Sequence, residues 1–169
     1  MGKSIGAKTI PLLSAAVISV TPALAEEQFP FIGISYGYHT VSPEITQSTS
    51  HGAVALRVGK QTMRWRTTFI GEFGSDYTTA GVDVDYILLD ELFGTPKLRP
   101  YLGANIRYMH YENDLLDESD GYSFGAQTGF IIYASDTIDV DLGYHYNIVE
   151  GIDGADTSRG ATISFHYFY

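Results

Sequence analysis

The chain of 169 residues has no cysteine, so neither a disulfide framework nor a thiolate metal site is available to it. Positive charge is scarce, with 10 lysine and arginine residues against 20 aspartate and glutamate residues. Nucleic-acid binding needs a basic face, so we expect no nucleic-acid partner. After the first 25 residues the sequence also lacks any apolar run long enough for a membrane-spanning helix. A membrane role would therefore require β-strands.

Residues 1–25 have the three regions of a secretory signal peptide. Two lysines and no acid stand near the start, residues 9–20 are mostly apolar, and the segment ends in Ala-Leu-Ala, a small-x-small cleavage site. The apolar run is shorter than the roughly 20 residues of a transmembrane anchor. We predict cleavage between Ala25 and Glu26, which leaves residues 26–169 as a single domain.

The predicted mature chain repeats a segment of about ten residues in which apolar and polar side chains alternate. Ten residues is the length that a tilted β-strand needs to cross the hydrocarbon layer. The eight predicted strands are 31–41, 51–60, 63–74, 80–90, 99–111, 121–133, 137–148 and 158–169. Long connections are predicted at 42–50, 112–120 and 149–157, medium ones at 75–79 and 91–98, and short ones at 61–62 and 134–136. Alternating long and short connections are typical of a barrel with unlike ends.

The two faces of these segments differ, because successive side chains of a strand point to opposite sides. One face is bulky and apolar in all eight segments, and the other is small and charged. A water-soluble barrel would place its charges outside, so the pattern predicts an all-β, eight-stranded antiparallel transmembrane β-barrel. A soluble β-sandwich with an aromatic core is the alternative. Two aromatic girdles are predicted, an outer one of Tyr36, Tyr38, Tyr108, Tyr122, Tyr144 and Tyr146 and an inner one of Trp65, Tyr167 and Tyr169.

The small, charged face is predicted to line the barrel lumen. The lumen of an eight-stranded barrel is only wide enough for side chains, and an unpaired charge there costs several kcal/mol. We therefore expect a salt-bridged plug, and the alternative is a small gated pore in which charge pairs exchange. The predicted network comprises Arg57, Arg64, Arg66, Glu72, Asp83, Asp85, Arg107, Asp139, Asp141 and His145.

Three histidines on the same face, His39, His145 and His166, raise the question of catalysis. His145 lies close in sequence to Glu150, and a histidine with a carboxylate can act as a general base. Residues 143–147, Gly-Tyr-His-Tyr-Asn, are faintly similar to the His-x-Ser-Asn sequence of lipid A deacylases, but Asn147 stands where the nucleophilic serine would be. Without that serine the mechanism lacks its nucleophile. We expect no enzymatic activity, no catalytic residue and no cofactor, with a lipid A acyl hydrolase as the less favoured alternative.

Acidic residues gather in two of the predicted loops. Residues 112–120 contain five acids and residues 150–158 contain three. Neither stretch has the ligand spacing of a known calcium-binding loop, so no metal site is predicted. Charge clusters of this kind are normally solvated, and we expect acidic extracellular loops.

Three stretches of the chain resemble the OmpA/OmpX-type family of small outer-membrane β-barrels: residues 31–38, 98–108 and 163–169. The resemblance implies an outer-membrane monomer that contacts lipid and lipopolysaccharide and has a structural or surface-interaction role, with a small diffusion pore as the alternative. It also implies that the barrel-assembly machinery reads Phe165, Tyr167 and Tyr169 in the terminal strand.

Overall fold

The computed structural model describes residues 27–42, 49–75, 77–88, 93–113, 116–152 and 155–169. The predicted signal peptide and its cleavage site at Ala25 and Glu26 lie outside these residues, so they stay a prediction. Within the described part of the chain, no helix is long and apolar enough to cross a membrane.

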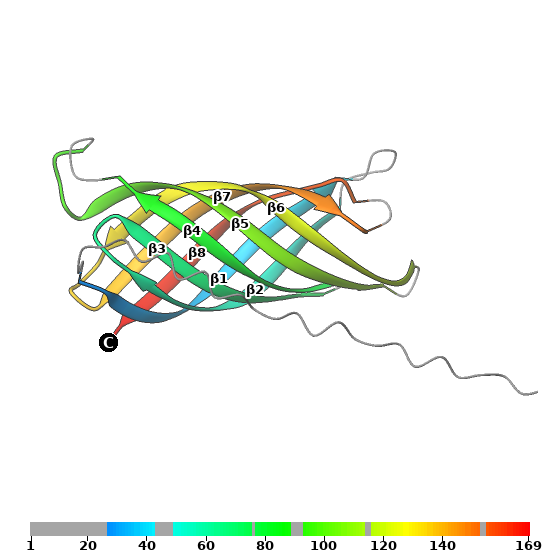
Figure 1. Cartoon of the computed structure of the whole chain (residues 1–169), viewed down its shortest axis with the longest axis horizontal. Helices are drawn as coiled ribbons and strands as arrows, with labels where there is room; N and C mark the ends of the chain where they lie inside the picture. The colour runs from blue at the N-terminus through cyan, green and yellow to red at the C-terminus, as the bar shows by residue number, and fades with distance from the viewer. Residues whose placement is uncertain (1–26, 43–48, 76, 89–92, 114–115, 153–154) are drawn as a thin grey trace, which may run out of the picture.

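Eight antiparallel strands form one closed barrel (Figure 1). They are β1 (Phe29–Ser42), β2 (Thr49–Gln61), β3 (Trp65–Gly74), β4 (Tyr77–Ile87), β5 (Leu98–Asn113), β6 (Leu116–Tyr133), β7 (Ile138–Glu150) and β8 (Thr157–Phe168). Each strand pairs with its neighbours in sequence, and β8 pairs with β1. The predicted fold class is therefore confirmed.

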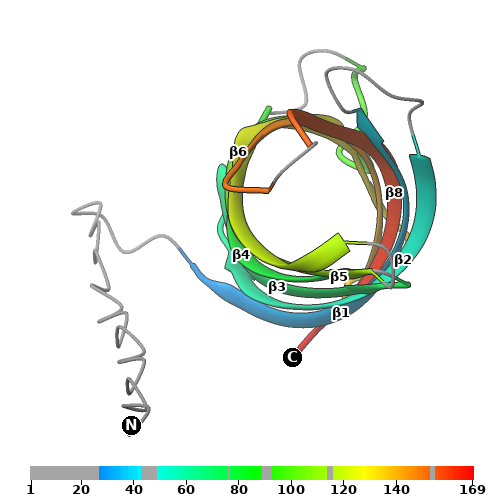
Figure 2. The same ribbon diagram turned by 90° about the vertical axis from the view of Figure 1, so that its right-hand side faces the viewer.

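The pairing of β1 with β8 closes the ring, with Ile34 opposite Leu56 on one side and opposite Phe165 on the other. Closure leaves no strand edge, so all backbone groups of the spanning region can pair within the protein. β1 begins and β8 finishes at the same end, at the left of Figure 1, which we call the inner end. Figure 2 looks at the opposite, outer end.

The outer surface of the barrel is an apolar belt. Outward side chains are unusually exposed for apolar groups, with 62% of Phe69 and 58% of Ile106 accessible. All nine aromatic residues of the two predicted girdles are exposed on this surface. Alternation of exposed and buried residues runs through β3 and β4, as expected for strands with one face toward lipid.

The connections differ from the prediction. The turns at 62–64 and 134–137 are tight, but the inner connection at 88–97 is longer than the predicted one. The predicted acidic loop at 112–120 is wrong, because β5 continues to Asn113 and β6 begins at Leu116. Beyond the membrane a strand needs no apolar alternation, so its continuation carries no signal that the sequence pattern could detect.

The inner end of the lumen is closed by apolar side chains. Phe31, Ile87 and Ile131 are fully buried, and Ile87 and Ile131 form a cluster with Tyr101 against which Tyr133 packs. The ring of Phe31 lies 4.7 Å from the imidazole of His166, measured between centroids. These buried apolar side chains lie next to the charged groups of the lumen, and Gln61 donates a 2.7 Å hydrogen bond to the Tyr133 hydroxyl beside them.

Candidate functional site

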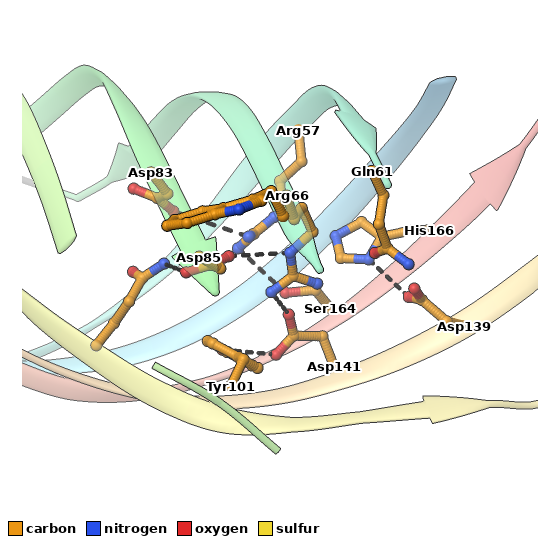
Figure 3. A network of polar contacts seen from close by, with 12 residues as sticks. Arg57, Gln61, Arg66, Asp83, Asp85, Tyr101, Asp139, Asp141, Ser164 and His166 are labelled. Atoms are coloured by element: carbon orange, nitrogen blue, oxygen red, sulfur yellow. Dashed lines mark hydrogen bonds and ion pairs between the residues drawn. The ribbon is translucent and has the colours of Figure 1, made fainter. Parts of the chain in front are cut away.

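The charged lumen is centred in its inner half on Arg66, which β3 directs inward and which is wholly buried (Figure 3). Its Nε lies 2.9 Å from Oδ2 of Asp85 on β4, and its Nη2 lies 2.5 Å from Oδ2 of Asp141 on β7. One guanidinium therefore joins two carboxylates from different walls of the barrel. The planar guanidinium, with its fixed N–H donors, suits this bridging role better than a lysine ammonium would.

Tyr101 completes the Arg66 cluster. Its ring centroid lies 4.7 Å from Cζ of Arg66, and its hydroxyl donates a 2.9 Å hydrogen bond to Asp141. The chain makes room for this ring with two glycines, since a Cβ at Gly129 or Gly143 would lie 2.7 Å from the Tyr101 hydroxyl oxygen. The small residues on the lumen face thus have a specific function: they allow a large side chain of β5 to lie along the inner wall over β6 and β7.

Two further contacts stabilise the inner half. His166 and Asp139 form a buried pair, with Nδ1 2.7 Å from Oδ1. Gln127 donates a 2.5 Å hydrogen bond to Oδ1 of Asp85, the carboxylate that also contacts Arg66. Buried charges need partners of this kind to offset the loss of water.

The outer half of the lumen is organised around Glu72 and Arg107. Nη1 of Arg107 lies 3.6 Å from Glu72, and its Nη2 lies 3.4 Å from Asp83. Tyr77 donates a 3.1 Å hydrogen bond to Glu72. Arg57 connects the halves, because its Nη2 lies 3.7 Å from Asp83 and its Nη1 donates a 3.4 Å hydrogen bond to Ser164.

A cavity of about 20 Å³ lies in this outer half. A water molecule needs roughly 10–15 Å³, so the cavity has space for one. Its lining is mostly polar and comes from seven strands, all except β2: His39, Val41, Glu72, Tyr77, Thr79, Arg107, Met109, Ser123, His145, Asn147 and Ser158.

Nine of the ten predicted lumen residues are buried in the barrel, and the exception is Arg64. The prediction for Arg64 is wrong because β3 begins at Trp65, which leaves Arg64 exposed in the turn before it. Thr62 forms this turn by donating its backbone N–H to the carbonyl of Trp65 at 2.7 Å. Alternation of faces applies only within a strand, so it does not extend to a turn residue.

The suggested pairing of His145 with Glu150 is also wrong. His145 faces the lumen, whereas Glu150 lies at an exposed position of the same strand. The partner of His145 is His39, and Nδ1 of His39 lies 3.1 Å from Nε2 of His145. Sequence reasoning placed both histidines in the lumen but did not bring them together, since 106 residues separate them.

A closed eight-stranded barrel with an apolar belt, aromatic girdles and a packed, charged interior defines the class: this chain is a transmembrane β-barrel of the outer-membrane type. Neither a protein-family model nor a curated protein matches it.

Solved structures are similar to it over most of their length. Neisserial surface protein A is 15% identical with a TM-score of 0.69, over 85% of this chain and 100% of that one. Outer membrane protein H of Pseudomonas aeruginosa is 19% identical with a TM-score of 0.62, over 83% and 99%. The N-terminal barrel domain of Pseudomonas aeruginosa OprF is 15% identical with a TM-score of 0.58, over 83% and 100%. The expected resemblance to small outer-membrane barrels is thus confirmed for the fold. The closed barrel and its exposed apolar belt are the features that place the chain in the outer membrane.

Proposed function

We propose that this protein is a sealed, non-conducting barrel that strengthens the outer membrane and presents its outer rim as an interaction surface. The observation that carries this proposal is the complete burial of Arg66 between Asp85 and Asp141. A charge bridge across the lumen fills the path that a solute would have to take. The apolar layer of Phe31, Ile87 and Ile131 adds a second barrier beneath it.

The membrane surface supports the structural part of the proposal. An exposed belt of aliphatic and aromatic side chains matches the hydrocarbon layer, and tyrosines suit the level of the headgroups. We propose outer-membrane lipid and lipopolysaccharide as its permanent neighbours. We also propose that the protein is a monomer, since the closed ring needs no second chain.

The outer rim supports the surface part. β5 and β6 pair as far as Asn113 and Leu116, well beyond Tyr108 and Tyr122 of the outer girdle. This hairpin includes much of the acidic stretch 112–120. An acidic hairpin favours a basic partner, because electrostatic complementarity guides encounter and excludes surfaces of like charge.

Single-channel recording in a planar bilayer tests the seal. The purified barrel should give no current steps beyond those of the protein-free bilayer. A porin in the same bilayer supplies the positive control. If the lumen is instead a pore, the wild type conducts and Arg107→Ala increases the conductance. Regular current steps from the wild-type protein would therefore contradict the sealed barrel and support the pore.

Placement of His145 argues against the lipid A acyl hydrolase. A lipid substrate lies outside the barrel wall, and the imidazole of His145 lies inside it with 3% of the residue exposed. We propose that the chain is not an enzyme. Mass spectrometry of lipid A from cells that express the wild type or His145→Gln should give identical acylation, and a His145-dependent loss of an acyl chain would contradict this.

The terminal strand carries the proposed assembly signal. Phe165, Tyr167 and Tyr169 project outward and are exposed, so a receptor could reach them before the barrel closes. We propose that the barrel-assembly machinery recognises this row. Outer-membrane yield of Tyr169→Ala should fall while refolding of the same purified variant in detergent stays near wild type, which separates recognition from stability.

A further inference from the structure

The strongest unexplained feature of the lumen is the histidine pair in its outer half. His39 on β1 and His145 on β7 are both opposite Gly160 of the intervening strand β8. A Cβ at Gly160 would lie 3.0 Å from Nδ1 of His39. The glycine therefore leaves the space through which imidazoles from two non-adjacent strands meet.

The geometry of the pair suits a shared metal ion. Nδ1 of His39 and Nε2 of His145 are 3.1 Å apart, and the ring centroids are 4.8 Å apart. Two imidazole nitrogens that each bind Zn²⁺ at about 2.0–2.1 Å in tetrahedral geometry lie about 3.3 Å from each other. The separation of the two nitrogens thus needs to change by only a few tenths of an ångström, and the rings turn so that both nitrogens face the ion.

The groups around the pair supply the remaining features of a metal site. Oε2 of Glu72 lies 3.4 Å from Nε2 of His39, the nitrogen that faces away from His145. A carboxylate on the far nitrogen of a ligating histidine fixes its tautomer and raises its basicity. Asn147 lines the same cavity, and its Oδ1, which has no hydrogen-bond partner and lies over Gly125, becomes an oxygen donor to the ion when the side chain turns toward the pair. The cavity volume of about 20 Å³ accommodates an ion or the water that completes its shell.

We propose that His39 and His145 bind one divalent transition-metal ion of the Zn²⁺ type, with Glu72 as the carboxylate that orients His39 and Asn147 as an oxygen donor. Imidazole ligands favour Zn²⁺, Ni²⁺ and Cu²⁺ over Ca²⁺ and Mg²⁺. Among the described residues, no three His, Cys, Asp or Glu side chains are arranged to hold a metal. The ion therefore keeps open coordination positions for water and exchanges with the surroundings.

Equilibrium dialysis of the purified barrel with Zn²⁺, in detergent and without a polyhistidine tag, tests this site. The wild type should bind one Zn²⁺ per chain, and His39→Gln and His145→Gln should each abolish this binding. Glu72→Gln should weaken it by about 10- to 100-fold, the usual effect of a lost carboxylate behind a histidine ligand. His110→Gln is the matched control, since it removes a histidine that pairs with a carboxylate at the exposed rim. A shift of gel mobility on boiling shows that each variant is folded.

Paramagnetic NMR of the wild type with Co²⁺ keeps the test independent of the variants. The side-chain amide of Asn147 should broaden or shift at one equivalent of Co²⁺, while that of Gln61, at the inner end of β2, should change much less. No stoichiometric binding by the wild type would overturn the proposal. Binding that persists without His39 and His145 but disappears in His110→Gln would also overturn it, because the metal would then belong to the rim.

Discussion

The two halves of the lumen use similar charged residues in different ways. In the inner half, one guanidinium bridges two carboxylates, a tyrosine ring lies against that guanidinium, and buried apolar side chains pack beside them. In the outer half, the charge contacts of Arg107 are 3.4–3.6 Å long and a cavity of about 20 Å³ remains among histidines and hydroxyl groups. Dense pairing stabilises the barrel, whereas the looser arrangement leaves polar atoms available to a ligand.

Replacement of Arg66 should have the largest effect on stability. Arg66→Met leaves Asp85 and Asp141 buried without their cation, and breaking a buried pair in this way costs about 3–5 kcal/mol. The neighbouring Arg64→Met, at the exposed turn, should change the free energy of unfolding by less than about 0.5 kcal/mol. Urea titration followed by the fluorescence of Trp65, the single tryptophan, measures both. Equal effects would remove the distinction between lumen and turn.

The two lumen tyrosines allow a direct test of inner against outer half. Each hydroxyl donates to a carboxylate, Tyr101 to Asp141 at 2.9 Å and Tyr77 to Glu72 at 3.1 Å. Tyr101→Phe should cost about 1.5–3 kcal/mol, the range for a hydrogen bond to a charged group. Tyr77→Phe should cost less than about 1 kcal/mol, because a water in the adjacent cavity can replace the hydroxyl as donor. A larger loss from Tyr77→Phe in the same urea titration would mean that the outer half is the more tightly coupled one.

Adding a methyl group at a glycine should destabilise the barrel in the tightly packed inner half but not on the lipid-facing surface. Gly143→Ala places a Cβ 2.7 Å from the hydroxyl oxygen of Tyr101, so the ring has to shift. Overpacking of this kind costs about 1–3 kcal/mol. Gly71→Ala is the matched control, because a Cβ there meets no atom within 4 Å. Thermal unfolding measures the stability of both variants. An unchanged unfolding temperature for Gly143→Ala would show that the Tyr101 ring can shift without cost.

The smallest expected effect lies beyond the membrane, at the rim. A hydrogen bond from His110, with Nδ1 2.7 Å from Oδ1, holds the pKa of Asp120 below its ordinary value. Because the folded pKa is depressed, this contribution to stability is present above the ordinary carboxyl pKa of about 4 and is lost as pH falls through the lowered value. NMR titration of the Asp120 carboxyl carbon should give a midpoint that rises toward the ordinary value in His110→Asn. An unchanged midpoint would show that His110 does not act on this carboxyl.

Most of the barrel could be predicted from the sequence, because alternation assigns a face to each residue of a spanning strand. Arg57, Arg66 and Asp139 lie where that rule placed them. The same rule points Phe31 and Tyr101 inward, and both side chains are buried in the barrel although they are aromatic. The structure shows that position in the strand, not hydrophobicity, determines the face.

Contacts between distant strands could not be predicted in this way. The meeting of His39 with His145 depends on the register of β8 against both β1 and β7, which brings each opposite Gly160. Register between non-adjacent strands is a property of the closed ring and has no local signal. The acidic hairpin escaped prediction for a similar reason, since β5 and β6 continue to pair beyond the outer girdle and this pairing leaves no mark on the apolar alternation.

Closure of β1 against β8 has a kinetic consequence. The other seven strand pairs join neighbours along the chain, whereas the closing pair joins Phe31 to Phe168 across the whole domain. Contacts at such sequence separation form slowly, because the entropy of bringing the ends together is lost before the contact compensates it. Until the last strand arrives, two rows of unpaired backbone groups cannot enter hydrocarbon at acceptable free energy. A chain cut off before Thr157 would retain its hairpins and still be unable to insert as a barrel.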